Sequence, residues 1–123
     1  MKKNKNFLNL NHYKLDVYQS ARELRIECYK ILSKIPDHEK FNIIDQIRRA
    51  STSVVLNITE GCSRKSQLER KRYFEIARGS VIELDSCFDI VMECNYIKIE
   101  ELTKIGNLIK TAFILLSKML KKD

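Results

Sequence analysis

The stretch from Gln46 to Gly61, Q-I-R-R-A-S-T-S-V-V-L-N-I-T-E-G, carries two side-chain patterns at helical spacing. Apolar residues at steps of three and four mark one buried face that begins just before it: Ile43, Ile47, Ala50, Val54 and Ile58. Hydrogen-bonding residues recur at the same steps, rotated by roughly 80°: Gln46, Arg49, Ser53, Asn57 and Glu60. The stretch therefore predicts an amphipathic helix with a polar stripe beside its core face.

The segment F-E-I-A-R-G-S-V-I-E-L at positions 74–84 is the predicted partner of this stripe. Ser80 and Glu83 interrupt a helix face that is otherwise formed by Ile76, Cys87, Ile90 and Cys94. If the two helices fold antiparallel about a turn near residues 63–64, Glu83 falls beside residues 44–48. A half-buried carboxylate needs a cation, so we expect the guanidinium of Arg48 or Arg49 to pair with Glu83.

We call the predicted set the polar seam, and it has eight members: Gln46, Arg48, Arg49, Ser53, Asn57, Glu60, Ser80 and Glu83. The favoured interpretation is structural, a hydrogen-bond network that fixes helix register or subunit docking. The alternative is a contact with a ligand or with nucleic acid.

The 123 residues predict one all-α domain, because three Gly and one Pro leave room for long uninterrupted helices. We predict a loose arm over residues 1–12 and an antiparallel, up-down-up-down four-helix bundle over 13–123. The expected helices span 14–34, 42–60, 66–95 and 99–121. Helix four carries more apolar residues than one core face needs, which predicts a subunit interface.

Local signals place the helix ends. Pro36 is expected to stop the first helix, and Asn42 to cap the second. Gly61 suits a left-handed residue that closes the second helix, and Ser66 with Glu69 forms a capping box for the third. Gly79, in the middle of the third helix, predicts close approach of another backbone.

Positive charge is concentrated in one part of the chain, whose formal net charge is +7. Residues 48–78 contain eight Lys or Arg and three Asp or Glu, which gives +5 locally. A basic cluster around the predicted turn indicates an anionic partner, RNA or DNA first: Arg64, Lys65, Arg70, Lys71 and Arg72. The alternative is an ordinary solvated, lysine-rich surface.

Catalytic and cofactor signals are absent from the sequence. The two histidines, His12 and His38, fall at neither triad nor metal spacing, and no Gly-rich phosphate loop occurs. The four cysteines, which form no C-x-x-C pair, are expected to be free thiols. We therefore expect a non-enzymatic protein with no metal or cofactor. Without a membrane-length apolar run or a signal-peptide pattern, we expect it to be cytoplasmic.

Several motifs together resemble the four-helix-bundle family encoded by intervening sequences in the 23S rRNA genes of some bacteria: L-D-V-Y-Q-S-A-R-E-L (15–24), Q-I-R-R-A-S-T-S-V (46–54), N-I-T-E-G (57–61) and R-Y-F-E-I-A-R-G-S (72–80). Tyr18 stands where the family usually has Trp, and Thr59 where it usually has Ala. The resemblance implies assembly into a homopentameric ring. The chain is also distantly similar to the accessory protein of diversity-generating retroelements, which implies nucleic acid and a reverse transcriptase as candidate partners.

The function predicted from these features is an oligomeric, non-enzymatic bundle protein whose basic face binds the RNA or DNA backbone. In a ring, the basic cluster would repeat with the ring symmetry and add weak phosphate contacts together. The alternative function is a structural or protein-interaction module without nucleic-acid affinity.

Overall fold

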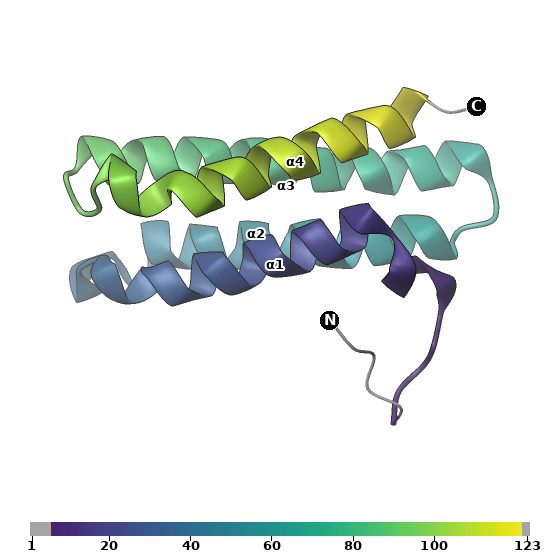
Figure 1. Cartoon of the computed structure of the whole chain (residues 1–123), viewed down its shortest axis with the longest axis horizontal. Coiled ribbons are helices and arrows are strands. Elements are labelled where there is room, and N and C mark those ends of the chain that lie inside the picture. The colour runs from purple at the N-terminus through teal and green to yellow at the C-terminus, as the bar shows by residue number, and fades with distance from the viewer. Residues whose placement is uncertain (1–5, 122–123) are drawn as a thin grey trace.

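The computed structural model describes residues 6–121, and four α-helices dominate them (Figure 1). Helix α1 spans Asp16–Ile31, α2 Ile43–Ser63, α3 Gln67–Glu93 and α4 Thr103–Lys121. The described residues contain no β-strand. Consecutive helices run antiparallel, and α4 returns to pack against α1 as well as α3 (Figure 1). This arrangement confirms the predicted four-helix bundle.

Short 3-10 helices occupy the links: Asn11–Lys14, Leu32–Lys34, Asp37–Glu39 and Ile99–Leu102. Helix α1 ends at Ile31, before the predicted end at residue 34, and Pro36 lies between the second and third of these 3-10 helices, where its missing N–H prevents an α-helix from continuing. Most of the predicted arm over residues 1–12 also precedes the helices. Residues 1–5 lie outside the described part, and Phe7 and Leu8 are exposed rather than docked on the bundle.

The core consists of one apolar stripe from each helix. Every residue of the α2 stripe predicted from Ile43 to Ile58 is buried, and so is a row along α1 and the link that follows it: Val17, Ala21, Leu24, Cys28, Ile31 and Ile35. Helix α4 buries Ile105, Ile109, Ala112 and Leu116, and partly buried apolar residues flank this row: Leu108, Phe113, Leu115, Met119 and Leu120. No helix within residues 6–121 combines the length and apolar character that a membrane span requires.

Three predicted helix-end or glycine roles are wrong. Asn42 makes no side-chain cap; its amide instead donates to Glu39 Oε1 at 3.0 Å. Gly61 is buried inside α2 and has no positive φ, because the helix continues to Ser63. Its hydrogen atom faces the buried ring of Phe74, which any Cβ at this position would overlap. Gly79 is exposed, with nothing within 4 Å of where its Cβ would lie.

Two other helix ends follow local rules. Ser66 Oγ accepts the Glu69 backbone N–H at 3.1 Å and caps α3, as the sequence predicts. Asn95 ends α3 in the left-handed region with φ 60°, a conformation that asparagine tolerates better than most residues. The Tyr96 N–H then reaches back to the Val91 carbonyl at 3.1 Å, so the last turn of α3 is closed.

Candidate nucleic-acid interface

The α2–α3 turn divides the predicted basic cluster into two groups, and Arg64 belongs to the structural group. Its Nη2 donates to Glu60 Oε2 at 2.8 Å and to the Tyr73 hydroxyl at 3.2 Å. Its guanidinium also lies 4.9 Å from the centre of the Tyr73 ring. The hydrogen bond to Tyr73 raises the pKa of Arg64, so the charge is retained. Arg64 therefore fastens the turn to the start of α3.

Arg70 closes the end of α2 from the next helix. Its Nη1 donates to the backbone carbonyls of Cys62 and Arg64, each at 3.1 Å. The last carbonyls of an α-helix have no partner within the helix, and here a side chain supplies one. The guanidinium also lies 5.9 Å from the centre of the Phe74 ring. Arg70 is half-buried and serves the fold.

The remaining three cations of the cluster are not used in this way. Lys65 and Arg72 are exposed and Lys71 is half-buried. Within residues 6–121, none of the three forms an ion pair. These side chains are the part of the cluster available to an external anion.

The centre of the polar seam joins α2 to α3 through hydroxyl groups. Ser80 Oγ donates to Ser53 Oγ at 2.8 Å, and Asn57 Nδ2 donates to the same Ser53 Oγ at 3.0 Å. Asn57 Nδ2 also donates to the Ser53 carbonyl at 2.9 Å. Ser80 is buried, so this contact joins the two helices away from solvent.

The predicted pairing of Glu83 with Arg48 or Arg49 is wrong. Glu83 is exposed, and no ion pair in the described chain joins it to either arginine. Arg49 instead lies 3.6 Å from Asp45 on its own helix, and Arg48 is exposed. Leu84, which packs into the core, lies about 100° around the helix from Glu83 and turns Glu83 outward. Gln46 is also exposed, and Glu60 is used by Arg64.

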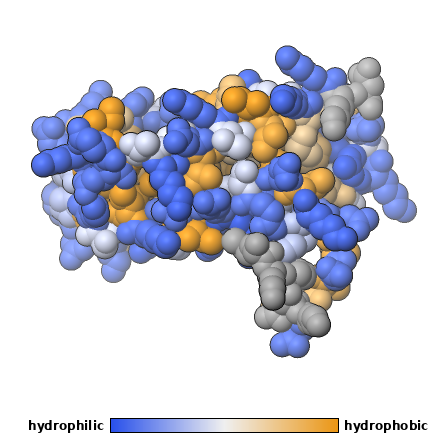
Figure 2. Space-filling model, viewed as in Figure 1, coloured by the Kyte–Doolittle hydropathy of each residue, from blue (hydrophilic) through white to orange (hydrophobic). Residues whose placement is uncertain are grey.

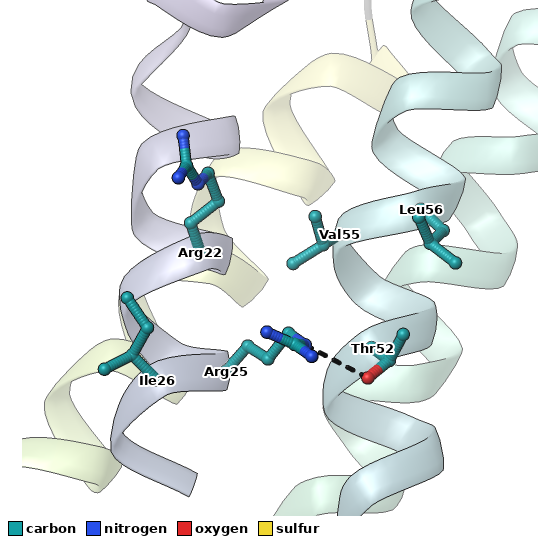
Figure 3. A pocket seen from close by; sticks show the side chains of 6 residues that line it. All are labelled: Arg22, Arg25, Ile26, Thr52, Val55 and Leu56. Carbon is teal, nitrogen blue, oxygen red and sulfur yellow. Dashed lines mark hydrogen bonds between the residues drawn. The ribbon is translucent and has the colours of Figure 1, made fainter. Parts of the chain in front are cut away.

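The structure has a groove between α1 and α2 that no motif in the sequence predicts. Figure 3 shows its first part, a hollow of about 240 Å³ lined by Arg22, Arg25, Ile26, Thr52, Val55 and Leu56. Arg25 reaches across it from α1, and its Nε donates to Thr52 Oγ1 at 3.1 Å. The Arg25 guanidinium also lies 4.5 Å from the centre of the Tyr29 ring. The hydrogen bond with Thr52 lowers the pKa of Tyr29.

Spacing along the chain does not predict this groove, because its arginines lie on two different helices. Arg22 and Arg25 flank the core residue Leu24 and read as an ordinary amphipathic border. The available signal was their helical spacing of three, on the helix that packs beside Arg48 and Arg49.

A histidine, a tyrosine and a glutamate meet where two links approach each other at one end of the bundle. The Tyr96 hydroxyl donates to Glu39 Oε2 at 2.6 Å, and His38 Nε2 lies 3.3 Å from the same hydroxyl. The hydrogen bond between Tyr96 and Glu39 raises the pKa of Tyr96 to about 12 and lowers the pKa of Glu39. Residues 6–121 contain no group of three His, Cys, Asp or Glu side chains placed to hold a metal ion.

The four cysteines are free thiols in the structure, as the sequence indicates. Cys28 and Cys87 lie in the core, and burial raises the pKa of Cys28 to about 12. Cys62 is half-buried and Cys94 is exposed at the end of α3. A raised pKa keeps a thiol protonated and unreactive, so we interpret the two buried cysteines as packing residues.

The fold and these surfaces define a class: an antiparallel four-helix bundle with a hydroxyl-linked α2–α3 pair and basic surface groups. The family model for the 23S rRNA-intervening sequence protein matches residues 13–122, and the chain belongs to this family. A solved structure with a similar fold is a protein of unknown function from the S23 ribosomal protein family of Bacteroides thetaiotaomicron. The two share 22% sequence identity with a TM-score of 0.79, over 86% of this chain and 99% of that chain. No curated protein matches the sequence.

Proposed function

We propose that this chain is a non-enzymatic, oligomeric bundle protein that binds the backbone of RNA or DNA through basic side chains at the α2–α3 turn. The observation that carries the proposal is that the basic side chains at that turn make two different kinds of contact. Arg64 and Arg70 hold the backbone, while Lys65, Lys71 and Arg72 have no acidic partner within the described residues. Because the backbone that carries these three side chains is fixed, only side-chain freedom is lost when they contact phosphate.

Assembly would strengthen such a surface. Several apolar side chains remain exposed on a single chain, among them Ile82 at 47% and Ile114 at 52%. Figure 2 shows apolar patches among mainly hydrophilic side chains on one face of the molecule. An oligomer, for which the family resemblance suggests a homopentameric ring, would cover part of this surface and repeat the basic turn. Repetition converts weak phosphate contacts into useful avidity. A reverse transcriptase or another protein remains a candidate partner.

The test is a fluorescence-anisotropy titration of a labelled RNA hairpin with the intact protein, from low to moderate salt. Backbone binding must weaken steeply as salt rises. The double variant Lys65→Glu/Arg72→Glu is expected to weaken binding at least about tenfold, because it replaces two phosphate contacts by repulsion. The control for a charge reversal elsewhere is Lys110→Glu, at an exposed position of α4, and each single variant, Lys65→Glu or Arg72→Glu, makes the same charge change. Absence of binding at low salt would remove the proposal.

A second candidate function is a structural or protein-interaction module without nucleic-acid affinity. The exposed isoleucines of α3 favour it, because Ile76, Ile82 and Ile90 are each more than 40% exposed. Light scattering tests the assembly that both candidates share. A mass several times 14.5 kDa is expected at micromolar concentration, and a monomer would contradict it. An oligomer that does not bind RNA would support the second candidate function.

A further inference from the structure

The α1–α2 face carries a groove that extends beyond the part drawn in Figure 3. Next to the first hollow lies one of about 450 Å³, and the two share Thr52 and Leu56 in their linings. A third hollow, of about 490 Å³, shares Tyr29 and Arg48 with the second. Because neighbouring hollows share lining residues, the three lie side by side along α1 and α2, and we call this row of hollows the α1–α2 groove.

Among the charged side chains that line the groove, cations outnumber carboxylates. Five basic side chains and one carboxylate, Asp37, border it. The basic side chains are Arg22, Arg25, Lys40, Arg48 and Arg49. The Asp45 carboxylate 3.6 Å from Arg49 offsets part of this charge.

Two of the three acidic side chains of α1 pair with a cation on α4 and do not line the groove. Glu23 and Glu27 turn to α4, where they pair with Lys104 at 3.7 Å and 3.4 Å. A long surface lined by cations, with few carboxylates to compete, fits a polyanion.

Flat side chains lie among these cations. Tyr29 is 39% exposed and borders both of the larger hollows. The Arg25 guanidinium is held over the Tyr29 ring by its bond to Thr52, so both planes are fixed before any ligand arrives. Leu56, 57% exposed, adds apolar surface beside them. Aromatic rings and guanidinium planes are the platforms on which unpaired bases stack.

We propose that the α1–α2 groove binds a single strand of RNA or DNA, with a base stacked on Tyr29 and phosphates contacted by Arg22 and Arg48. Adjacent packed helices lie about 8–10 Å apart, so the furrow between them admits one extended strand more readily than a duplex. The inference rests on the proposed nucleic-acid function and adds to it the ligand class and a second binding surface. The α2–α3 turn would then extend the path of the same backbone.

The experiment titrates the full chain into a labelled oligouridine of about 16 nucleotides, a length at the upper end of single-strand site sizes. Arg48→Glu is expected to weaken binding at least about tenfold, and Arg48→Ala to reduce the slope of log K against log salt by about 0.7, the loss of one phosphate contact. Lys110→Glu, which makes the same charge change in the opposite α3–α4 groove, is expected to change binding less than about twofold.

Substitutions of Tyr29 test for base stacking, because they leave the charge of the groove unchanged. Tyr29→Leu removes the ring but keeps apolar bulk, and it is expected to weaken binding at least about fivefold. Tyr29→Phe keeps the ring and should stay within about twofold of the parent. Melting of each variant by circular dichroism establishes that the fold is intact, which is expected because Tyr29 and Arg48 are exposed.

Several results would overturn the inference. Equal weakening by Arg48→Glu and Lys110→Glu, or equal competition by a duplex of the same length, would remove the groove while the proposed function stands. Equal competition by polyglutamate of matched charge would assign the groove to an acidic protein instead. Weakening by Lys65→Glu/Arg72→Glu alone would place all binding at the turn. No binding of the parent protein to either RNA at low salt would remove both proposals.

Discussion

The two ends of the bundle are closed by different chemistry. At the α2–α3 turn, Arg70 donates to two backbone carbonyls, and Gly61 lets the Phe74 ring lie against α2. At the opposite end, the α1–α2 and α3–α4 links are joined by side chains that titrate (Figure 1). Lys34 and Glu101 make a further ion pair there. The first end depends on shape and permanent charge, and the second on protonation states.

Gly61→Ala should have the largest effect, because the new methyl group overlaps a buried ring at the shape-dependent end. Overpacking of this kind costs about 1–3 kcal/mol of unfolding free energy, and we expect about 2 kcal/mol. Urea denaturation measures it. The matched control is Gly79→Ala, where the space is open and the substitution should stabilise by about 0.5–1 kcal/mol. Equal effects of the two substitutions would remove the assigned role of Phe74.

Arg70→Met tests the permanent charge at the same end. Methionine keeps an unbranched stem beside Phe74 but leaves the Cys62 and Arg64 carbonyls without their donor. The expected loss is about 1–2 kcal/mol of unfolding free energy, largely independent of pH between 5 and 9, since arginine stays charged. Arg72→Met, at an exposed position on the same turn of α3, is the control and should have little effect.

Tyr96→Phe tests the titratable end and should lower the thermal midpoint by a few degrees at neutral pH. The lowered pKa of Glu39 means that its stabilisation is present above 4.5 and is lost as the pH falls through the folded value. The raised pKa of Tyr96 means that its stabilisation is present below 10 and is lost as the pH rises through about 12.

Melting curves of parent and Tyr96→Phe should therefore differ most between pH 4.5 and 10 and converge on either side. A difference that persists unchanged at pH 3 would show that Tyr96 acts through packing and not through its bond to Glu39.

Glu83→Ala should have the smallest effect on the free energy of unfolding. It measures how much an exposed charge between the two ends of the bundle contributes to stability. With Glu83 exposed and unpaired with Arg48 or Arg49, we expect a change within about 0.5 kcal/mol. Chemical denaturation at low protein concentration measures the single chain. A loss of several kcal/mol of unfolding free energy in the single chain would instead support the buried ion pair that the sequence predicts.

Sequence reasoning succeeded where a side chain's role depends on its own helix. The buried rows of α1 and α2, the Ser66 cap and the break at Pro36 all follow from spacing and local backbone rules. It failed where two helices meet. Arg64 and Arg70 read as members of one basic cluster, yet their bonds reach across the turn to Tyr73 and to the end of α2. No spacing in the sequence separates them from Lys65.

Four amphipathic helices can be read from the residues alone, because helical periodicity places each apolar residue on a known face. Which side chains meet between the helices depends on how the helices pack. A rotation of one helix by a fraction of a turn exchanges Glu83 for Ser80 at the α2 contact, and close packing in the core fixes that rotation. The same packing brings the arginines of α1 beside those of α2, residues that lie more than twenty positions apart in the chain.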